Sequence, residues 1–260
     1  MRAHALSLLA FMAAACGEPE PLARGEAGRV WSGHAFDLET AEGVVPVVLA
    51  GVTGPNRELH PEAADATRGA LLDRVGPGLQ ARPASDPETD RYGRMIAAVT
   101  TSDGDLAESL VRAGWLIVWP REGQTLDFGP LYAAEADARA EGRGGWGAGA
   151  FAISDTDPDR LAQRLDGPVI VQGRVVATGE ARDGRVFVNF GLDWRSDFTA
   201  TADRNARTRF EEAEIDLYAL EGAVVRVRGW LYAYNGPAIE LSHPAQIEIL
   251  DAPDGRALPR

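Results

Sequence analysis

Side chains that can hold a metal ion lie in two polar segments of this chain. His34 stands in the first segment, and Glu58 and His60 stand in the second. Imidazole nitrogens and carboxylate oxygens suit zinc, so the three side chains would form a transition-metal site if the two segments met in the fold. The alternative interpretation is that both histidines are exposed loop residues, because the three ligands are spread over two loops with no tight spacing.

Arg94, which ends the sequence Asp-Arg-Tyr-Gly-Arg, is a candidate for binding an anion. A guanidinium presents paired N–H donors that match a phosphate or a carboxylate. Two roles stay open for it: binding of an external anion, or an ion pair with a neighbouring carboxylate. The net charge of −13 argues against a large nucleic-acid surface, because proteins that hold a phosphate backbone usually present a basic face. A local basic patch is still compatible with an acidic total.

The single cysteine, Cys16, follows an apolar run at residues 5–15 that ends in three alanines. This run is too short to cross a bilayer, which takes about 20 residues, and it has the size of a signal-peptide apolar region. Small residues directly before a cysteine resemble the bacterial lipobox, in which the thiol is lipidated and the cysteine becomes the mature N-terminus. We therefore expect a lipoprotein of the bacterial cell envelope, anchored to the membrane on the periplasmic side. An ordinary signal peptide, with Cys16 incidental, is the alternative.

Composition and periodicity divide the chain into six parts. In order, we expect a signal peptide with its lipobox, a tether, a first β-rich domain, a linker, a second β-rich domain and a tail, at residues 1–16, 17–28, 29–150, 151–166, 167–252 and 253–260. Each domain is long enough to bury its own core. Because the linker has little apolar periodicity, we expect few contacts across it and two domains that fold separately.

The first domain alternates short strands with three helices. Apolar and β-branched runs predict strands at residues 29–31, 35–38, 44–52, 79–82, 95–100 and 115–119. Helical spacing of apolar residues predicts helices at residues 61–75, 106–112 and 131–141. The second helix has a capping sequence at residues 103–105 and a stop at Gly114. This mixture is typical of a small α+β barrel.

The second domain repeats the strand pattern around one helix. We expect strands at residues 169–178, 186–191, 197–202, 224–234 and 239–250, and helices at 204–220 and, within the linker, 160–165. Three strands, a helix and two strands is the order of an OB barrel. The expected fold class is therefore mainly β with helices (α+β), built as tandem OB-fold barrels. Aromatic residues of this domain could stack on bases or sugars, or pack within the strands, namely Trp194, Tyr232 and Tyr234.

Four segments of the first domain resemble the staphylococcal nuclease (thermonuclease) family. They read Val-Val-Leu-Ala-Gly-Val-Thr-Gly-Pro at 47–55, Thr-Asp-Arg-Tyr-Gly-Arg at 89–94, Asp-Gly-Asp-Leu-Ala-Glu-Ser-Leu-Val-Arg-Ala-Gly at 103–114 and Gly-Gly-Trp at 144–146. They occur in the family's order and cover about residues 29–147. The resemblance implies an OB-type barrel with three helices.

The resemblance also implies a chemistry, but the chain keeps little of it. The family hydrolyses phosphodiesters with Ca²⁺ held by two carboxylates, a glutamate that activates water and two arginines that neutralise the phosphate. Only Arg94 is retained. His34 replaces the first metal carboxylate, and Val48 replaces the first arginine. Thr53 and Gly54 replace the second metal carboxylate and its neighbour, and Asn56 replaces the general-base glutamate. Four of the five catalytic side chains are therefore missing, and an asparagine cannot accept a proton at neutral pH.

These substitutions predict a non-catalytic binding protein whose partner is a protein, a glycan or a nucleic acid. No cofactor is expected, and Ca²⁺ would enter only if the ancestral site worked. One alternative is an active metal-dependent nuclease whose ligands are rebuilt from Arg57, Glu58 or His60. Another is a structural envelope protein with no small ligand. The first two functions differ in whether carboxylates converge beside Arg94 in the folded barrel.

Overall fold

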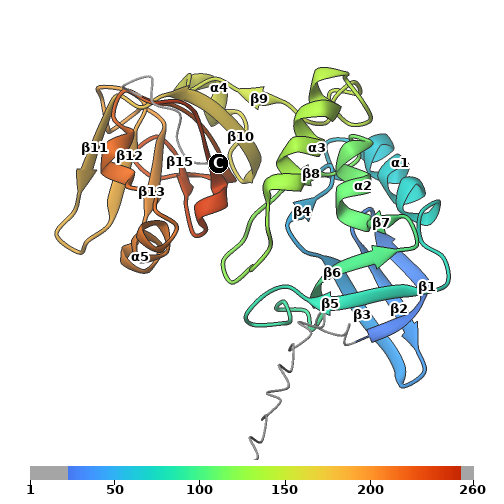
Figure 1. Cartoon of the computed structure of the whole chain (residues 1–260). Coiled ribbons are helices and arrows are strands. Elements are labelled where there is room, and N and C mark those ends of the chain that lie inside the picture. Colours follow the sequence, from blue (N-terminus) through green and yellow to red (C-terminus); the bar gives the residue numbers. More distant parts are fainter. Residues whose placement is uncertain (1–22, 253–260) are drawn as a thin grey trace, which may run out of the picture.

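The computed structural model describes residues 23–252, so Cys16, the predicted signal peptide and the predicted tail lie outside the described residues. Within this range the chain is a mixed α+β structure, composed mostly of strands with five α-helices. Figure 1 shows two β-rich units side by side, joined by the segment that contains β9 (Ile153–Ser154). The first unit contains a closed five-stranded, OB-like barrel.

The barrel closes because the two end strands of its sheet pair with each other. Its strands are β1 (Ala23–Ser32), β2 (Ala35–Thr40), β3 (Gly43–Leu49), β5 (Leu79–Pro83) and β6 (Met95–Thr101). The first three form an antiparallel meander, β5 pairs with β1 and β6, and the parallel pair β3–β6 completes the ring. Alternating side chains fill the interior, among them Phe36, Leu38, Val47 and Leu49. A barrel predicted for this part of the sequence is therefore confirmed.

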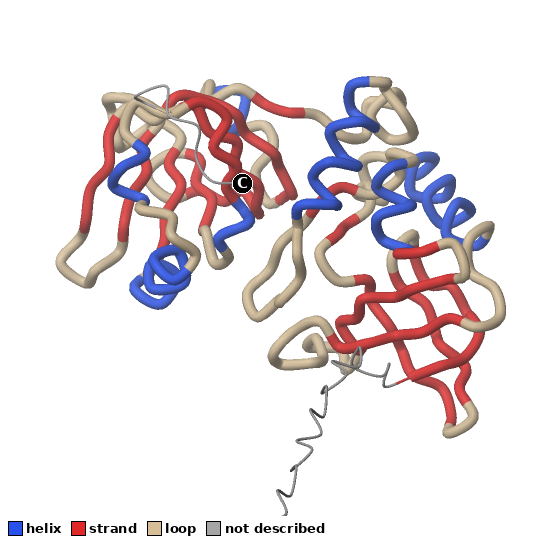
Figure 2. Tube along the Cα trace, viewed as in Figure 1, coloured by secondary structure: helices blue, strands red, loops and turns tan. Residues whose placement is uncertain are grey.

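Three helices lie together on one side of the barrel (Figure 1, Figure 2), namely α1 (Pro61–Leu72), α2 (Leu106–Arg112) and α3 (Gly129–Ala140). Helix α2 begins as predicted, because the Asp105 carboxylate accepts a hydrogen bond of 2.7 Å from the backbone N–H of Glu108. Gly114, at φ +77°, ends the turn that follows this helix. Three short strands complete the unit: β4 (Val52–Thr53), β7 (Gly104–Asp105) and β8 (Ile117–Val118).

The second unit is one curled sheet with two α-helices, α4 (Pro158–Ala162) and α5 (Arg204–Glu212). Its strands after β9 are β10 (Gly167–Arg174), β11 (Ala177–Glu180), β12 (Val186–Asn189), β13 (Thr199–Ala202), β14 (Val224–Ala233), β15 (Pro237–Glu240) and β16 (Ile247–Asp251). They run in the order β11-β12-β13-β15-β14-β10-β9, with β16 also paired to β14. Only residues 175 and 176 separate β10 from β11. The nearly continuous strand that β10 and β11 form therefore joins the two ends of the strand order.

Two predicted segments near the domain boundaries have more regular structure than expected. Residues 23–28, predicted as part of the tether, belong to β1 and pair with β2 and β5. The predicted linker, 151–166, contains β9, which pairs in parallel with β10, in addition to α4, which overlaps the short helix expected at 160–165. Short pairings of this kind depend on partner strands far away in the sequence, so local periodicity does not reveal them.

Two other predicted elements are shorter than expected. The strand predicted at 44–52 is interrupted at Gly51, which adopts φ +73°. The helix predicted at 204–220 ends at Glu212, because Glu214 adopts φ +59° and the next N–H donates back to the carbonyl of Phe210 at 2.9 Å. A 3₁₀ turn, Leu217–Leu220, follows. Across residues 23–252, no helix is both long and apolar enough to span a membrane.

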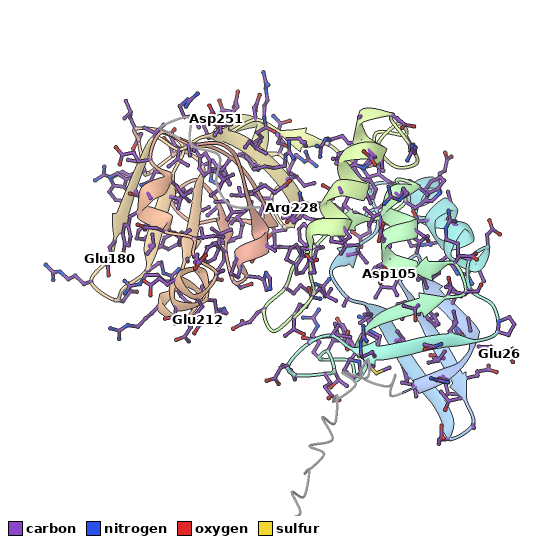
Figure 3. All side chains as sticks on the ribbon, viewed as in Figure 1. Glu26, Asp105, Glu180, Glu212, Arg228 and Asp251 are labelled. Atoms are coloured by element: carbon purple, nitrogen blue, oxygen red, sulfur yellow. The ribbon has the colours of Figure 1, made fainter. Side chains whose placement is uncertain are left out.

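A buried ionic cluster holds the two units together. Arg228 on β14 is fully buried, and its Nη1 donates to the Val118 carbonyl at 2.9 Å and to both carboxylate oxygens of Glu135 in α3 at 3.1 and 2.9 Å. Nη2 pairs with Glu248, and the guanidinium lies 4.6 Å from the centre of the Tyr132 ring. Burial alone would lower the pKa of Arg228, but Tyr132, Glu135 and Glu248 together raise it above its usual value. Figure 3 shows Arg228 at the junction of the units.

The loop between β8 and α3, residues 119–128, adds further contacts with the second unit. The backbone carbonyl of Gln124 lies 3.0 Å from Nε2 of His243, and Glu122 forms an ion pair of 3.0 Å with Arg209 in α5. The expectation that few contacts cross between the two domains is therefore wrong. Their contact includes the fully buried pair of Arg228 and Glu135, in which loss of one partner would leave the charge of the other buried.

Candidate functional site

The turn between β1 and β2 places His34 at one end of the barrel, beside the segment that follows β4. A Cβ atom at the preceding Gly33 would lie 2.1 Å from Cγ2 of Thr67 in α1, so the absence of a side chain there lets this helix approach the turn. A Cβ atom at Gly54 would lie 3.6 Å from Nδ1 of His34. The fold thus brings together two positions that the resemblance assigns to the metal site, although neither carries a carboxylate.

His34 is uncharged at neutral pH. Burial, followed by the nearby positive charges of Arg121 and Arg94, lowers the pKa of His34 from 6.5 to about 4. Its Nδ1 lies 3.5 Å from the hydroxyl of Ser32. A neutral imidazole beside two guanidinium groups is a poor ligand for calcium, which prefers anionic oxygen donors.

Arg94, the residue that the resemblance retains, forms an ion pair with Asp90. Nε and Nη2 of Arg94 lie 2.8 and 2.6 Å from Oδ2 of Asp90. Oδ1 of the same carboxylate accepts hydrogen bonds from the backbone N–H groups of Tyr92 and Arg94, at 2.9 and 3.0 Å. Burial raises the pKa of Asp90, but these hydrogen bonds outweigh it and hold the pKa below its usual value. Of the two roles considered for Arg94, the ion pair with a neighbouring carboxylate fits this geometry.

Two further arginines, not singled out in the sequence, lie near this ion pair. Arg91 donates to the Tyr92 hydroxyl at 2.6 Å, and the guanidinium groups of Arg91 and Arg94 lie 4.8 and 5.2 Å from the centre of the Tyr92 ring. Burial lowers the pKa of Arg121, and the charge of Arg94 lowers it further. This end of the barrel therefore gathers the guanidinium groups of Arg91, Arg94 and Arg121 near the carboxylate of Asp90. Among the residues that the structure describes, Asp90 is the one carboxylate that pairs with Arg94.

Three other positions that the resemblance assigns to catalysis, Val48, Thr53 and Asn56, contribute to the core, to a strand pair and to a loop. Val48 is buried within β3, and Thr53 lies in β4, which pairs with β8. The side-chain oxygen of Asn56 accepts hydrogen bonds from the backbone N–H groups of Glu58 and Leu59, at 2.8 and 3.3 Å. The Asn56 amide therefore stabilises the loop before α1 and offers no proton acceptor for catalysis.

The side chains considered as replacement ligands do not assemble around His34. Arg57 pairs with Asp65 on the protein surface at 2.7 Å. Glu58 and His60 line a recess of about 310 Å³ together with Gly54 and residues 163–170 of the second unit, and His34 is not among its lining residues. In the part of the chain that the structure describes, no group of three His, Cys, Asp or Glu side chains is placed to hold a metal ion. Of the two interpretations of His34, Glu58 and His60, the transition-metal site is therefore not formed among the described residues.

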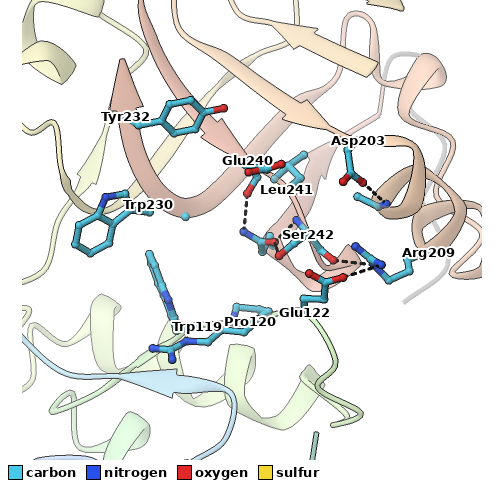
Figure 4. Close-up of a pocket in the computed structure, with 14 residues that line it drawn as sticks. Trp119, Pro120, Glu122, Asp203, Arg209, Trp230, Tyr232, Glu240, Leu241 and Ser242 are labelled. Carbon is cyan, nitrogen blue, oxygen red and sulfur yellow. Dashed lines mark hydrogen bonds and ion pairs between the residues drawn. The ribbon is translucent and has the colours of Figure 1, made fainter. Parts of the chain in front are cut away.

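The three aromatic residues considered for ligand binding lie in two separate places. Trp194 and Tyr234 are about half exposed and line a recess of about 340 Å³ beside β12. Tyr232 instead lines a cleft of about 620 Å³ between the two units, together with Trp119 and Trp230 (Figure 4). Trp230 could have been identified from its spacing, because residues two apart on a strand face the same side. Trp119 belongs to the other unit, and no spacing connects it to them.

Comparison with known proteins adds no family to this description. No family model matches the chain, and no curated protein matches it at a significant level.

Proposed function

We propose that this chain is a non-catalytic binding protein of the bacterial cell envelope. Its first unit is a staphylococcal-nuclease-type OB barrel that has lost its catalytic residues, and its second unit is a further OB-like barrel. The strand order of the second unit supports the second assignment, since it equals that of the first barrel once β10 and β11 are counted as one strand. The sequence around Cys16 supports a lipid anchor.

The arrangement of charges around Arg94 is the observation that carries this proposal. Metal-assisted phosphodiester hydrolysis needs carboxylates for the cation and a base for the attacking water. Here the carboxylate beside Arg94 is Asp90. Both of its oxygens already accept hydrogen bonds, Oδ1 from the backbone N–H groups of Tyr92 and Arg94 and Oδ2 from the Arg94 guanidinium. His34 is neutral, and the Asn56 amide oxygen is used within its own loop. These groups stabilise the loops at this end of the barrel, and they supply neither the metal ligands nor the base that hydrolysis needs.

A nuclease assay on the full chain tests the proposal. DNA and RNA are incubated with the protein in Ca²⁺, Mg²⁺ and Zn²⁺ in turn, beside the variants Arg94→Ala and Arg57→Ala. Loss of one charge-stabilising or proton-transfer group costs on the order of 10²–10³ in rate, so we expect no cleavage above background from any of the three proteins. Metal-dependent cleavage by the wild type and Arg57→Ala, absent from Arg94→Ala, would show an active nuclease site.

One observation favours that second function, an active nuclease. Arg121 provides a second guanidinium close to Arg94, where the chain has lost the family arginine to Val48. Two guanidinium groups can neutralise a phosphate in its transition state. They supply neither the metal ligands nor the base, so this candidate requires carboxylates to be recruited from elsewhere when substrate binds.

A further inference from the structure

The cleft between the two units has an aromatic end formed by both of them. Trp119 follows β8 in the first unit, while Trp230 and Tyr232 lie on β14 in the second unit. Figure 4 shows these three side chains gathered at one end of the cleft. The Trp230 side chain is 54% exposed although it stands beside other large rings. Aromatic faces left open to water in a concave site are surfaces on which a flat or ring-shaped ligand can stack.

The opposite end of the cleft is polar and contains both donors and acceptors. Figure 4 shows Asp203, Arg209 and Glu122 there. Arg209 donates to the Ser242 carbonyl at 2.9 Å and pairs with Glu122 of the first unit at 3.0 Å. Asp203 accepts a hydrogen bond of 2.7 Å from the N–H at residue 206 and so caps α5. Glu240, which is exposed, adds a further carboxylate along the cleft. A ligand with many hydroxyl groups would find partners of both kinds.

The ionic cluster between the units fixes the two tryptophans relative to each other. Arg228 precedes Trp230 by two residues on β14, and it donates to the carbonyl of Val118, the residue directly before Trp119. Gln246 supports the floor of the cleft, because its amide nitrogen donates to the Arg228 carbonyl at 3.0 Å. A ligand that enters the cleft therefore does not have to order these walls, which reduces the cost of binding.

From these contacts we infer that the cleft binds a neutral saccharide, with sugar rings stacked on Trp119 and Trp230 and hydroxyl groups bound at the polar end. This inference rests on the proposed binding function and adds the site and the class of ligand. Carboxylates line the cleft at Glu122, Asp203 and Glu240, so a polyphosphate chain would meet like charges. A compact cation would be repelled by Arg121 and Arg209, which line the same cleft.

Isothermal titration with defined neutral oligosaccharides tests this inference on the full chain. The probes are maltotetraose, cellotetraose and chitotetraose, compared with an octathymidylate and with choline. We expect at least one neutral saccharide to bind. Replacement of Trp230 or Trp119 by alanine should weaken this binding about tenfold or more, as truncation of a central aromatic contact usually does. The variant Trp230→Phe should keep most of the affinity, because the ring remains.

Trp194→Ala is the matched control, since Trp194 is a tryptophan of similar exposure that lines the other recess. Its affinity should equal that of the wild type. The inference is overturned if no saccharide binds, if Trp194→Ala loses the binding while Trp230→Ala keeps it, or if octathymidylate or choline binds in place of the sugars. If the saccharide titration gives one of these results and the nuclease assay shows no cleavage, the saccharide inference is wrong but the proposed non-catalytic function is not contradicted. Metal-dependent cleavage in the nuclease assay would remove that function instead.

Discussion

Replacement of Arg228 by methionine removes the charge at the centre of the inter-unit cluster while it retains an extended side chain. In the native protein Arg228 bonds both oxygens of Glu135, which is itself fully buried. Without Arg228, Glu135 keeps the backbone N–H of Val118 at 2.7 Å and a longer contact with Arg139 at 3.7 Å. The carboxylate then remains in a site of low dielectric constant with most of its compensation lost.

The magnitude follows from this burial. Removal of one partner from a buried ion pair costs about 3–5 kcal/mol in the free energy of unfolding. In a protein of about this size 1 kcal/mol lowers Tm by about 2–4 °C, so Arg228→Met should lower it by about 10 °C. Glu135→Gln removes the opposite charge. In the double variant neither Arg228 nor Glu135 leaves the other buried charge without its partner, and Glu248 keeps its ion pair with Arg226. The double variant should therefore be more stable than the sum of the single losses predicts, by about 1–3 kcal/mol.

Urea unfolding followed by tryptophan fluorescence, together with calorimetry, measures these values. The variant Arg57→Met is the control, because Arg57 forms an exposed pair with Asp65 and should contribute less than about 1 kcal/mol. Equal stability of Arg228→Met and the wild type would refute the buried cluster. Additive losses in the double variant would show that Arg228 and Glu135 do not act on each other.

Two further predictions concern His34 and Cys16. Folding lowers the pKa of His34 from 6.5 to about 4, so the unfolded chain binds more protons between these values, and the stability due to neutral His34 is lost as the pH falls through this window. At about 1.4 kcal/mol per pKa unit, the wild type should lose up to about 3 kcal/mol more than His34→Gln between pH 7 and pH 4 in urea unfolding; equal losses contradict this reasoning. Cys16→Ser should be released from the membrane fraction, and membrane association of this variant with no lipid on the parent protein would show that Cys16 is not the anchor.

The first barrel could be predicted from the sequence because its signals are local. Phe36 and Leu38 alternate with polar neighbours, as the inward-facing residues of a strand do, and both are fully buried. Asp105 caps the start of helix α2, and Gly114 ends the turn that follows this helix, as the sequence predicts. The ion pair of Arg94 with Asp90 is also local, since four residues separate its partners.

The contact between the units could not be predicted, because its partners are distant in the sequence. Arg228 alternates with apolar residues along β14, a pattern that normally places an arginine in solvent. Its main partner, Glu135, lies 93 residues away on a helix of the other unit. Separation in the sequence also explains why Tyr232 was identified as a candidate ligand contact while Trp119, which lines the same cleft from the other unit, was not. Nothing in the local pattern shows that two such faces will cover each other.

The loop at residues 119–128 connects the Arg94–Asp90 ion pair with the cleft between the two units. Arg121 lies close to the Arg94–Asp90 pair and also lines the cleft, while Glu122 extends to Arg209 in the second unit. Asp203 and Glu240 line the same cleft as Arg121, and their carboxylates would repel an anion that entered it. A nuclease requires the opposite arrangement, an approach that attracts the phosphate backbone. In the function that we propose, the residues at the barrel end and the carboxylates of the cleft therefore favour the same kind of ligand, one without phosphate groups.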